Sequence, residues 1–216
     1  MKQVFDNISH EMSTLTTKRY STSFSLGIKM LHADLQQPIY SIYGFVRFAD
    51  EIVDSFHGFD KEWLLEDFRK QTYQAIDDGI SLNPILNSFQ WVVNKYQIPL
   101  DLIETFLESM KMDLNKQAYN EDQYKKYILG SAEVVGLMCL RVFCQGNEEH
   151  YQQLKPAAMK LGSAFQKINF LRDLKADFKV MGQSYFPGID VSTFTEESKR
   201  AIEADIDKGF KEAYIG

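Results

Sequence analysis

The sequence predicts an all-α protein. Apolar residues recur at helical spacing over long stretches, whereas the alternation typical of β-strands never extends beyond a few residues. The chain also lacks repeats, low-complexity linkers and a Gly-rich phosphate loop. Its 216 residues, 44% hydrophobic and 25% charged, are enough for one domain with a substantial core. We therefore predict a single helical domain over residues 1–216.

Capping residues and helix breakers divide the chain into segments. Asp60, Asn147 and Thr195 each precede a helical pattern as its cap, and Asn83-Pro84 starts a further helix. Pro38 is expected in the first turn of a helix that runs to about residue 55. The other predicted helices are an amphipathic one over 3–18 and those over about 24–31, 61–78, 84–96, 99–116, 121–144, 150–180 and from 196 onward.

Composition excludes several classes of function. A formal charge of −6 and a pI of about 5.3 argue against a nucleic-acid partner, which requires basic patches. Cys139 and Cys144 form neither a zinc motif nor a disulfide framework, so we expect reduced thiols. The N-terminus lacks a signal-peptide core, and the most apolar window, 134–144, is interrupted by Arg141. We expect a cytoplasmic protein whose oligomeric state the sequence does not specify.

Two stripes of acidic residues are the candidate site. An α-helix turns by about 100° per residue, so residues four apart lie within about 40° of each other. This spacing places one set of polar residues on a stripe roughly 60° wide and a second on a stripe roughly 80° wide, both on otherwise apolar helices. The first stripe holds Tyr43, Arg47, Asp50 and Asp54, and the second holds Gln166, Asn169, Asp173 and Asp177.

A row of carboxylates can simply be the solvated face of a helix. Two features favour a metal site instead. Asp is a poor helix former where Glu would serve solubility better, and the rows lack the Lys at i+4 that usually accompanies exposed acids. Facing Asp rows would repel each other unless a cation lay between them. Oxygen ligands alone suit a hard ion that bridges to phosphate, which is Mg²⁺, with Mn²⁺ as its substitute.

Five segments, in order along the chain, resemble the motifs of the squalene/phytoene synthase family, the head-to-head branch of the all-helical isoprenoid synthases. The two acidic stripes match its two Asp-rich motifs. The other matches are Ser21-Thr22-Ser23-Phe24, Tyr127 to Gly136, and Gly182-Gln183-Ser184-Tyr185-Phe186-Pro187, where Gln183 replaces the family arginine. A single D-x-x-x-D would be weak evidence, whereas this ordered set is specific.

The resemblance implies an isoprenoid-synthase-type helical bundle around a central cavity, and the head-to-head (1'-1) condensation of two prenyl diphosphates. The sequences of these motifs are most similar to those of bacterial phytoene synthases. This implies that two geranylgeranyl diphosphates give phytoene through a cyclopropyl diphosphate, a reaction of carotenoid biosynthesis. Since these substrates are lipids, peripheral contact with a membrane is also expected. Family members usually carry several dozen further residues, so we expect that the chain lacks the C-terminal helices of the family.

The resemblance also assigns roles to residues. As metal ligands it implies Asp50, Asp54, Asn169, Asp173 and Asp177. As catalytic residues it implies Asp50, Asp54, Asp173, Asp177 and Arg47. As substrate-binding residues it implies Tyr20, Ser21, Thr22, Ser23, Tyr43, Arg47, Tyr127, Gln166 and Arg172.

Several of these residues have a second interpretation. Ser21 or Ser23 can cap a helix as well as cradle a diphosphate, and Arg172 can pair with a neighbouring acid. The small residues from Gly130 to Gly136 either allow close helix packing or leave room for a slender apolar ligand.

The function also has alternatives. One is a squalene or dehydrosqualene synthase that uses two farnesyl diphosphates, with NADPH required only for the squalene type. Another is a non-catalytic, truncated helical homologue. A third alternative is a helical bundle in which two metal ions activate oxygen. The sequence argues against it, because the chain contains no Glu-x-x-His pair.

Overall fold

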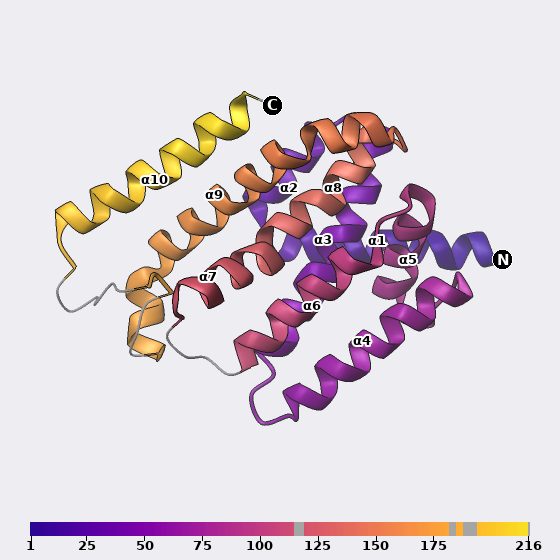
Figure 1. Cartoon of the computed structure of the whole chain (residues 1–216). Helices are drawn as coiled ribbons and strands as arrows, with labels where there is room; N and C mark the ends of the chain where they lie inside the picture. Colours follow the sequence, from indigo (N-terminus) through magenta and orange to yellow (C-terminus); the bar gives the residue numbers. More distant parts are fainter. Residues whose placement is uncertain (115–118, 182–184, 188–193, 216) are drawn as a thin grey trace. The chain divides into compact units, whose positions relative to one another are not determined.

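The computed structural model describes residues 1–114, 119–181, 185–187 and 194–215, and for 175–181 it describes the backbone alone. All regular structure in these ranges is helical, as predicted (Figure 1). The helices are α1 (Lys2–Tyr20), α2 (Thr22–Lys29), α3 (Ala33–Asp54), α4 (Lys61–Asp78), α5 (Pro84–Tyr96), α6 (Leu100–Leu114), α7 (Glu121–Ile128), the π-helix η1 (Leu129–Glu133), α8 (Val134–Cys144), α9 (Glu148–Met181) and α10 (Glu196–Tyr214).

Contacts divide the chain into two compact units. The first comprises Met1–Leu100 and Arg141–Asn147, and the second comprises Asp101–Leu140 and Glu148–Gly216. The first acidic stripe belongs to the first unit, and the second stripe belongs to the second. A single domain over 1–216 remains a prediction.

The predicted caps define the helix ends. The side chain of Asp60 accepts a hydrogen bond from the Trp63 amide at 3.0 Å, and that of Asn83 accepts one from Ile85. Thr195 caps α10 in the same way. The prediction for Pro38 was wrong, because α3 begins at Ala33 and Pro38 lies in its second turn. The proline removes one intrahelical hydrogen bond, and packing of the buried residues that follow it sustains the helix.

The core of the first unit contains stacked aromatic rings. The Phe45 ring of α3 lies 3.8 Å from the Phe89 ring of α5, measured between centroids, and 5.5 Å from the Phe68 ring of α4. Phe45 and Phe89 are fully buried. These contacts join α3, α4 and α5, so the helix that carries the first stripe has a rigid base.

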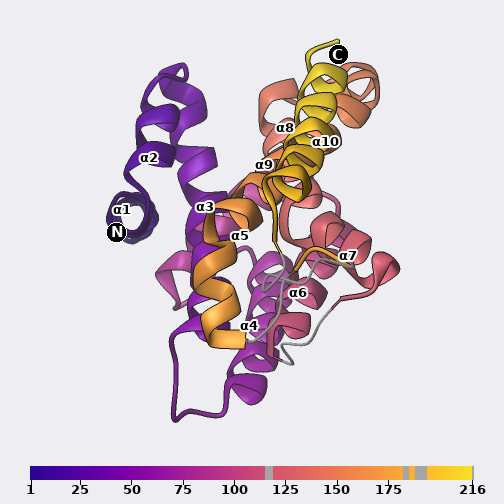
Figure 2. The ribbon, with the colours of Figure 1, turned by 90° about the vertical axis from the view of Figure 1, so that its left-hand side faces the viewer.

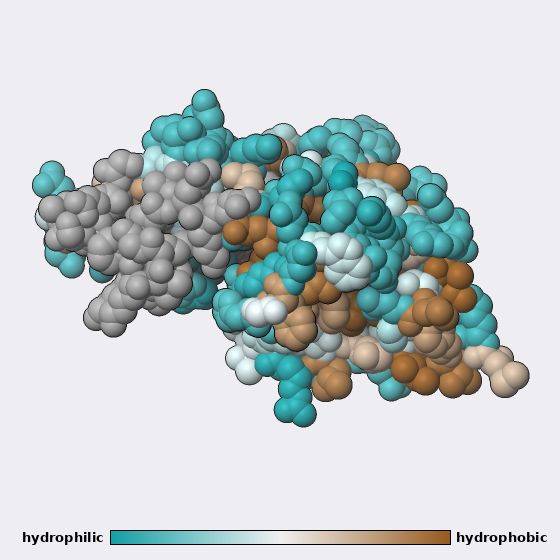
Figure 3. Space-filling view, turned by 90° about the horizontal axis from the view of Figure 1, so that it is seen from below, coloured by the Kyte–Doolittle hydropathy of each residue, from teal (hydrophilic) through white to brown (hydrophobic). Residues whose placement is uncertain are grey.

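Helix α1 packs on α3 and α5 through a polar face. Its fully buried residues are Ser9, Ser13 and Thr17. A Cβ atom on Gly44 of α3 would lie 3.1 Å from the Ser13 side chain, so small residues on both helices permit this close approach. The apolar side of α1 therefore points outward. Hydrophobic side chains gather on the part of the surface near the N-terminus (Figure 3), and in Figure 2 α1 is seen end-on at the edge of its unit.

A buried network of hydroxyls and amides accompanies this polar face. Ser88 lies 2.6 Å from Ser41 and 3.1 Å from Nδ1 of His10, and His10 packs edge-on against Trp91. Burial lowers the pKa of His10, and the nearby Asp6 carboxylate opposes this shift only partly.

We expect the protein to become less stable in acid, because unfolding lets His10 take up a proton. A histidine whose pKa is lower in the folded state binds fewer protons there than in the unfolded chain. The stabilisation is therefore complete above the unfolded pKa of about 6.5 and is lost as the pH falls from there toward the folded pKa. His10→Gln should flatten the dependence of the urea midpoint on pH below about 6.5.

His32→Gln is the matched control, since the His32 side chain is 75% exposed, and it should leave the dependence in place. An unchanged slope in His10→Gln would contradict the assignment.

The second unit packs tightly around η1. A Cβ on Gly162 of α9 would lie 3.0 Å from the Ala132 carbonyl oxygen in η1. Helix α10 runs alongside α9 in both Figure 1 and Figure 2, and ion pairs Lys160–Glu212 (3.0 Å) and Lys167–Asp205 (2.5 Å) link the two. Of the two roles considered for the small residues, the structure shows close helix packing.

The apolar stretch through α7, η1 and α8 is longer than the predicted window 134–144. Glu121–Cys144 is a 24-residue helical segment that is long and apolar enough to cross a membrane by composition. Half of its apolar window is buried within the chain, which is also a property of core helices.

Candidate functional site

The first stripe lies on one side of α3, opposite the buried side that contains Phe45 and Ala49. Tyr43, Arg47 and Asp50 are partly buried, while Asp54 at the end of the helix is exposed. The Asp50 side chain is 32% exposed, so it is accessible to a ligand. The four residues thus share one side of α3, between core and solvent along most of its length, and their role as a site stays a prediction.

Arg47 is the centre of this stripe. Its Nη2 donates to Glu51 Oε2 at 2.7 Å, and its Nη1 lies 3.8 Å from Asp50 Oδ2. The guanidinium carbon lies 4.4 Å from the centre of the Tyr20 ring, in a cation–π contact. Arg47 Nε is buried and has no acceptor among the described residues. Arg47 thus presents one unused donor next to two carboxylates.

Nearby charges and burial determine the protonation states of Glu51 and Arg47. Burial alone would raise the pKa of Glu51, but hydrogen bonds led by that from Arg47 outweigh burial, and the pKa is lowered. Burial would likewise lower the pKa of Arg47, yet Glu51, Asp50 and Asp54 together raise it. Both groups are charged at neutral pH, and sequence reasoning had missed the role of Glu51.

Ser21 is the N-cap of α2, which is one of the two roles that the sequence allowed for it. Its Oγ accepts a hydrogen bond from the Phe24 amide at 3.2 Å, and Thr22 and Ser23 are exposed in the first turn. The Phe24 ring stacks on the Tyr43 ring with centroids 4.6 Å apart. Burial raises the pKa of Tyr43, although its hydrogen bond with Ser21 counteracts this. The structure thus brings Tyr20, Ser21 and Tyr43 into one group around Arg47.

The second stripe lies on α9. The Asn169 amide donates to Gln166 Oε1 at 3.4 Å, and both residues are partly buried. Arg172 donates through Nε and Nη2 to the two oxygens of Asp173, at 2.8 and 2.6 Å. This pairing lowers the pKa of Asp173. The structure thus supports the second interpretation of Arg172, as the partner of a neighbouring acid, while the side chain of Asp177 lies outside the described residues.

Within the described part of the chain, no group of three or more His, Cys, Asp or Glu side chains is arranged to hold one ion. The donors present on the stripes are carboxylate and amide oxygens, which suit Mg²⁺. A small carboxylate count is compatible with Mg²⁺, which commonly binds through one or two carboxylates plus substrate phosphates and water.

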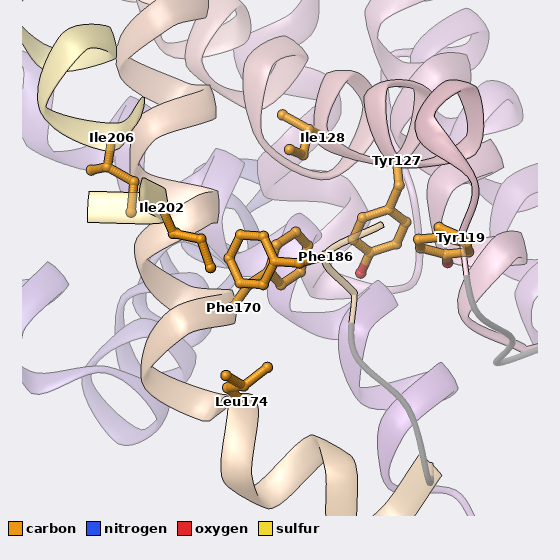
Figure 4. Packing of buried hydrophobic residues seen from close by; sticks show 8 residues of the cluster. All are labelled: Tyr119, Tyr127, Ile128, Phe170, Leu174, Phe186, Ile202 and Ile206. Carbon is orange, nitrogen blue, oxygen red and sulfur yellow. The ribbon is translucent and has the colours of Figure 1, made fainter. Parts of the chain in front are cut away.

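An aromatic cluster adjoins the second stripe. Phe170, next in sequence to Asn169, stacks on Tyr185 with centroids 4.5 Å apart and on Tyr127 at 5.9 Å. Figure 4 shows Tyr119 beside Tyr127 and Phe186 against Phe170. The buried members of this cluster are Tyr119, Tyr127, Ile128, Phe170, Leu174, Phe186, Ile202 and Ile206. The cluster belongs to the core of the second unit, and Phe170 lies on the same helix as the predicted ligands of the second stripe.

Tyr127 carries a buried hydroxyl in this cluster. It donates a hydrogen bond of 2.8 Å to Asp113 Oδ2 of α6. Burial, followed by the charge of Asp113, raises the pKa of Tyr127 well above its usual value, so the phenol stays protonated. Asp113 was not among the predicted site residues, and its bond to Tyr127 joins positions 14 residues apart on different helices.

We expect Tyr127→Phe to destabilise the protein by about 1–3 kcal/mol, because the variant removes a donor from a buried carboxylate. Urea unfolding would measure the change. Tyr124→Phe is the matched control. Tyr124 lies in the same cluster, and its hydroxyl makes no hydrogen bond to the described residues. Equal losses in the two variants would show that the hydrogen bond to Asp113 contributes nothing.

Comparison with known proteins identifies the family of the chain. A family model described as squalene/phytoene synthase matches residues 17–212. Phytoene synthase of Arthrospira platensis is 24% identical over 94% of this chain and 69% of its own length. Phytoene synthase 1 of Zea mays is 29% identical over 79% of this chain, which spans only 42% of that relative.

Two solved structures share the fold. A dehydrosqualene synthase has a TM-score of 0.82 at 21% identity, covering 97% of this chain and 77% of its own. A squalene synthase from Alicyclobacillus acidocaldarius has a TM-score of 0.84 at 19% identity, covering 97% and 83%. The all-α, isoprenoid-synthase-type fold is thus confirmed, and the relatives are synthases of the prenyltransferase type. Because the family model matches nearly the whole sequence, the chain belongs to the squalene/phytoene synthase family.

Proposed function

We propose that this chain condenses two prenyl diphosphates head to head, and that the substrates are two geranylgeranyl diphosphates and the product is phytoene. The match of the family model to residues 17–212 carries the proposal. Relatives named phytoene synthase support the C20 substrate. The reaction is that of a prenyltransferase. One substrate loses diphosphate and the other a proton to give a cyclopropyl diphosphate, which then loses its own diphosphate, rearranges and loses a second proton to give phytoene.

The diphosphate ends of the substrates would bind at the two stripes. Arg47 is suited to this role, since a guanidinium binds anionic oxygens through several N–H groups and its side chain is 24% exposed. Glu51 accepts a hydrogen bond of 2.7 Å from Nη2 of Arg47 and so fixes the orientation of the guanidinium before a substrate arrives. Tyr20, Ser21, Thr22, Ser23, Tyr43, Gln166 and Arg172 complete the proposed substrate-binding set.

Asp50, Asp54, Asn169, Asp173 and Asp177 are the residues we propose as ligands for Mg²⁺ or Mn²⁺. A bound divalent ion would act as a Lewis acid that stabilises the departing diphosphate. These oxygens fit such an ion because Mg²⁺ shares its coordination between a few carboxylates and substrate phosphates. The ion pair with Arg172 keeps Asp173 ionised, as a ligand must be.

Departure of diphosphate leaves an allylic cation, which water would quench. The rings of Tyr127, Phe170 and Tyr185 are mutually stacked in the core of the second unit. Aromatic faces stabilise a cation through their quadrupole and exclude water at the same time. We propose that this cluster shields the cation, with Tyr127 held in its orientation by Asp113.

The test is incubation of the protein with labelled C15 or C20 prenyl diphosphates and Mg²⁺, with and without NADPH. We expect phytoene from the C20 substrate, without any need for NADPH. Squalene or dehydrosqualene from the C15 substrate would replace the substrate assignment and keep the reaction class. Absence of product and of released pyrophosphate with both substrates would instead favour a non-catalytic helical homologue.

A further inference from the structure

Helix α1 is oriented opposite to an ordinary surface helix. Its buried side consists of the hydroxyl residues Ser9, Ser13 and Thr17, all fully buried. A surface helix normally buries its apolar stripe and exposes its polar one. The close packing on Gly44 explains the small buried residues, but it does not explain the apolar residues on the outer side.

The outer side of α1 carries a continuous apolar stripe. Val4, Ile8, Met12 and Leu15 follow one another at spacings of four, four and three residues and are 41–61% exposed. Helix α2, which contacts α1, adds Leu26 and Met30 on the side opposite its buried Ser25 and Ile28. These six side chains form one apolar surface at the N-terminal end of the chain, which we call the α1–α2 face.

The charges of this face are basic, although the chain is acidic. Lys18 and Arg19 in the last turn of α1 and Lys29 in the last turn of α2 are all exposed. Glu11 is the exposed acid of α1, whereas the partly buried Asp6 is paired with Lys2 and accepts a hydrogen bond from Asn87. The face therefore has three cations against one acid, in a protein with a formal charge of −6.

We propose that the α1–α2 face docks on an anionic lipid surface. Exposed apolar residues beside Lys and Arg are the chemistry of a helix that lies in the headgroup region of a bilayer. A second copy of the chain fits less well, because six apolar side chains are far fewer than the roughly 20–30 residues a side of a stable dimer. Docking does not depend on the proposed reaction, but it would place the protein where prenyl lipids dissolve.

Vesicle co-sedimentation tests the proposal. The purified chain is mixed with vesicles of phosphatidylcholine alone or with about 30% phosphatidylglycerol, and the bound fraction is measured against lipid concentration. We expect binding to the anionic vesicles and at least about tenfold weaker binding to the neutral ones or in high salt. Val4→Ser, Ile8→Ser and Leu15→Ser combined should weaken binding about tenfold or more.

Matched variants separate this face from the rest of the surface. Lys18→Glu with Arg19→Glu should weaken binding at least about tenfold. Lys125→Glu with Lys126→Glu, an exposed basic pair in the last turn of α7, should leave it within about twofold of wild type. Ile80→Ser with Leu82→Ser is the control for exposed apolar residues. Circular dichroism of each variant confirms that it is folded.

Two results would overturn the proposal. One is equal binding to neutral and anionic vesicles, or no binding to either. The other is a concentration-dependent dimer, seen by light scattering, that the Val4, Ile8 and Leu15 substitutions abolish without affecting vesicle binding. That dimer would assign the face to a second copy of the chain.

Discussion

Asp50→Asn combined with Asp173→Asn is expected to lower the rate of pyrophosphate release by at least about a thousandfold, and each single change by about a hundredfold. Asn keeps the shape of the side chain but removes one negative charge from each stripe. The affinity of an oxygen site for Mg²⁺ depends strongly on the number of charged ligands. The measurement is release of pyrophosphate from labelled geranylgeranyl diphosphate over a range of Mg²⁺ concentrations.

Excess Mg²⁺ should partly restore the single variants, which a purely structural role of the carboxylates would not explain. Asp34→Asn is the matched control, since Asp34 lies on the same helix as Asp50 and its side chain is 87% exposed. Pyrophosphate release that persists in the double variant would rule out the proposed metal ligands. Circular dichroism should show that the double variant is folded, so that a loss of activity does not reflect unfolding.

Gly130→Ala is expected to destabilise the protein by about 2 kcal/mol. The new Cβ would lie 2.5 Å from the Ser109 Cβ and 2.6 Å from the Thr105 carbonyl oxygen of α6. A backbone oxygen cannot rotate away, so helix and partner must separate, at a typical cost of about 1–3 kcal/mol. The gain from replacing glycine by alanine in a helix, at most about 1 kcal/mol, offsets only part of this cost. Urea unfolding measures the difference.

Gly136→Ala supplies the control in the same helical segment. Its Cβ would lie 3.5 Å from the Ala158 carbonyl oxygen, an ordinary contact, so the variant should be neutral or slightly stabilised. If Gly130→Ala loses no more stability than Gly136→Ala, then η1 and α6 can separate without cost. Gly130→Val should destabilise the protein more than Gly130→Ala does, because it adds two further methyl groups at the same contact.

Local chemistry was readable from the sequence. The N-caps Asp60, Asn83 and Thr195 fixed the starts of three helices, since each cap bonds to an amide two or three residues away. The ordered motifs likewise predicted the family, and the helical period placed Arg47 and Asp50 on one stripe. Such interactions depend on residues within about one turn of each other.

Interactions between helices could not be predicted in this way. The hydrogen bond from Tyr127 to Asp113 joins α7 to α6, and the contact of Arg47 with the Tyr20 ring joins α3 to α1. The π-helix η1 also escaped prediction, because it lies within a sequence that reads as continuous α-helix. Segments of this kind often mark functional sites, and here η1 begins at Leu129, two residues after Tyr127.

The sequence by itself determined that the chain is helical, where most helices begin, and which residues form the acidic stripes, because these follow from periodicity and capping. Only the tertiary structure decided that Glu51 and Tyr20 hold Arg47, that Arg172 binds Asp173, and that α1 turns its hydroxyl side inward. The physical reason is that a helix has several faces, and which one is buried depends on the partners that pack closely enough to exclude water.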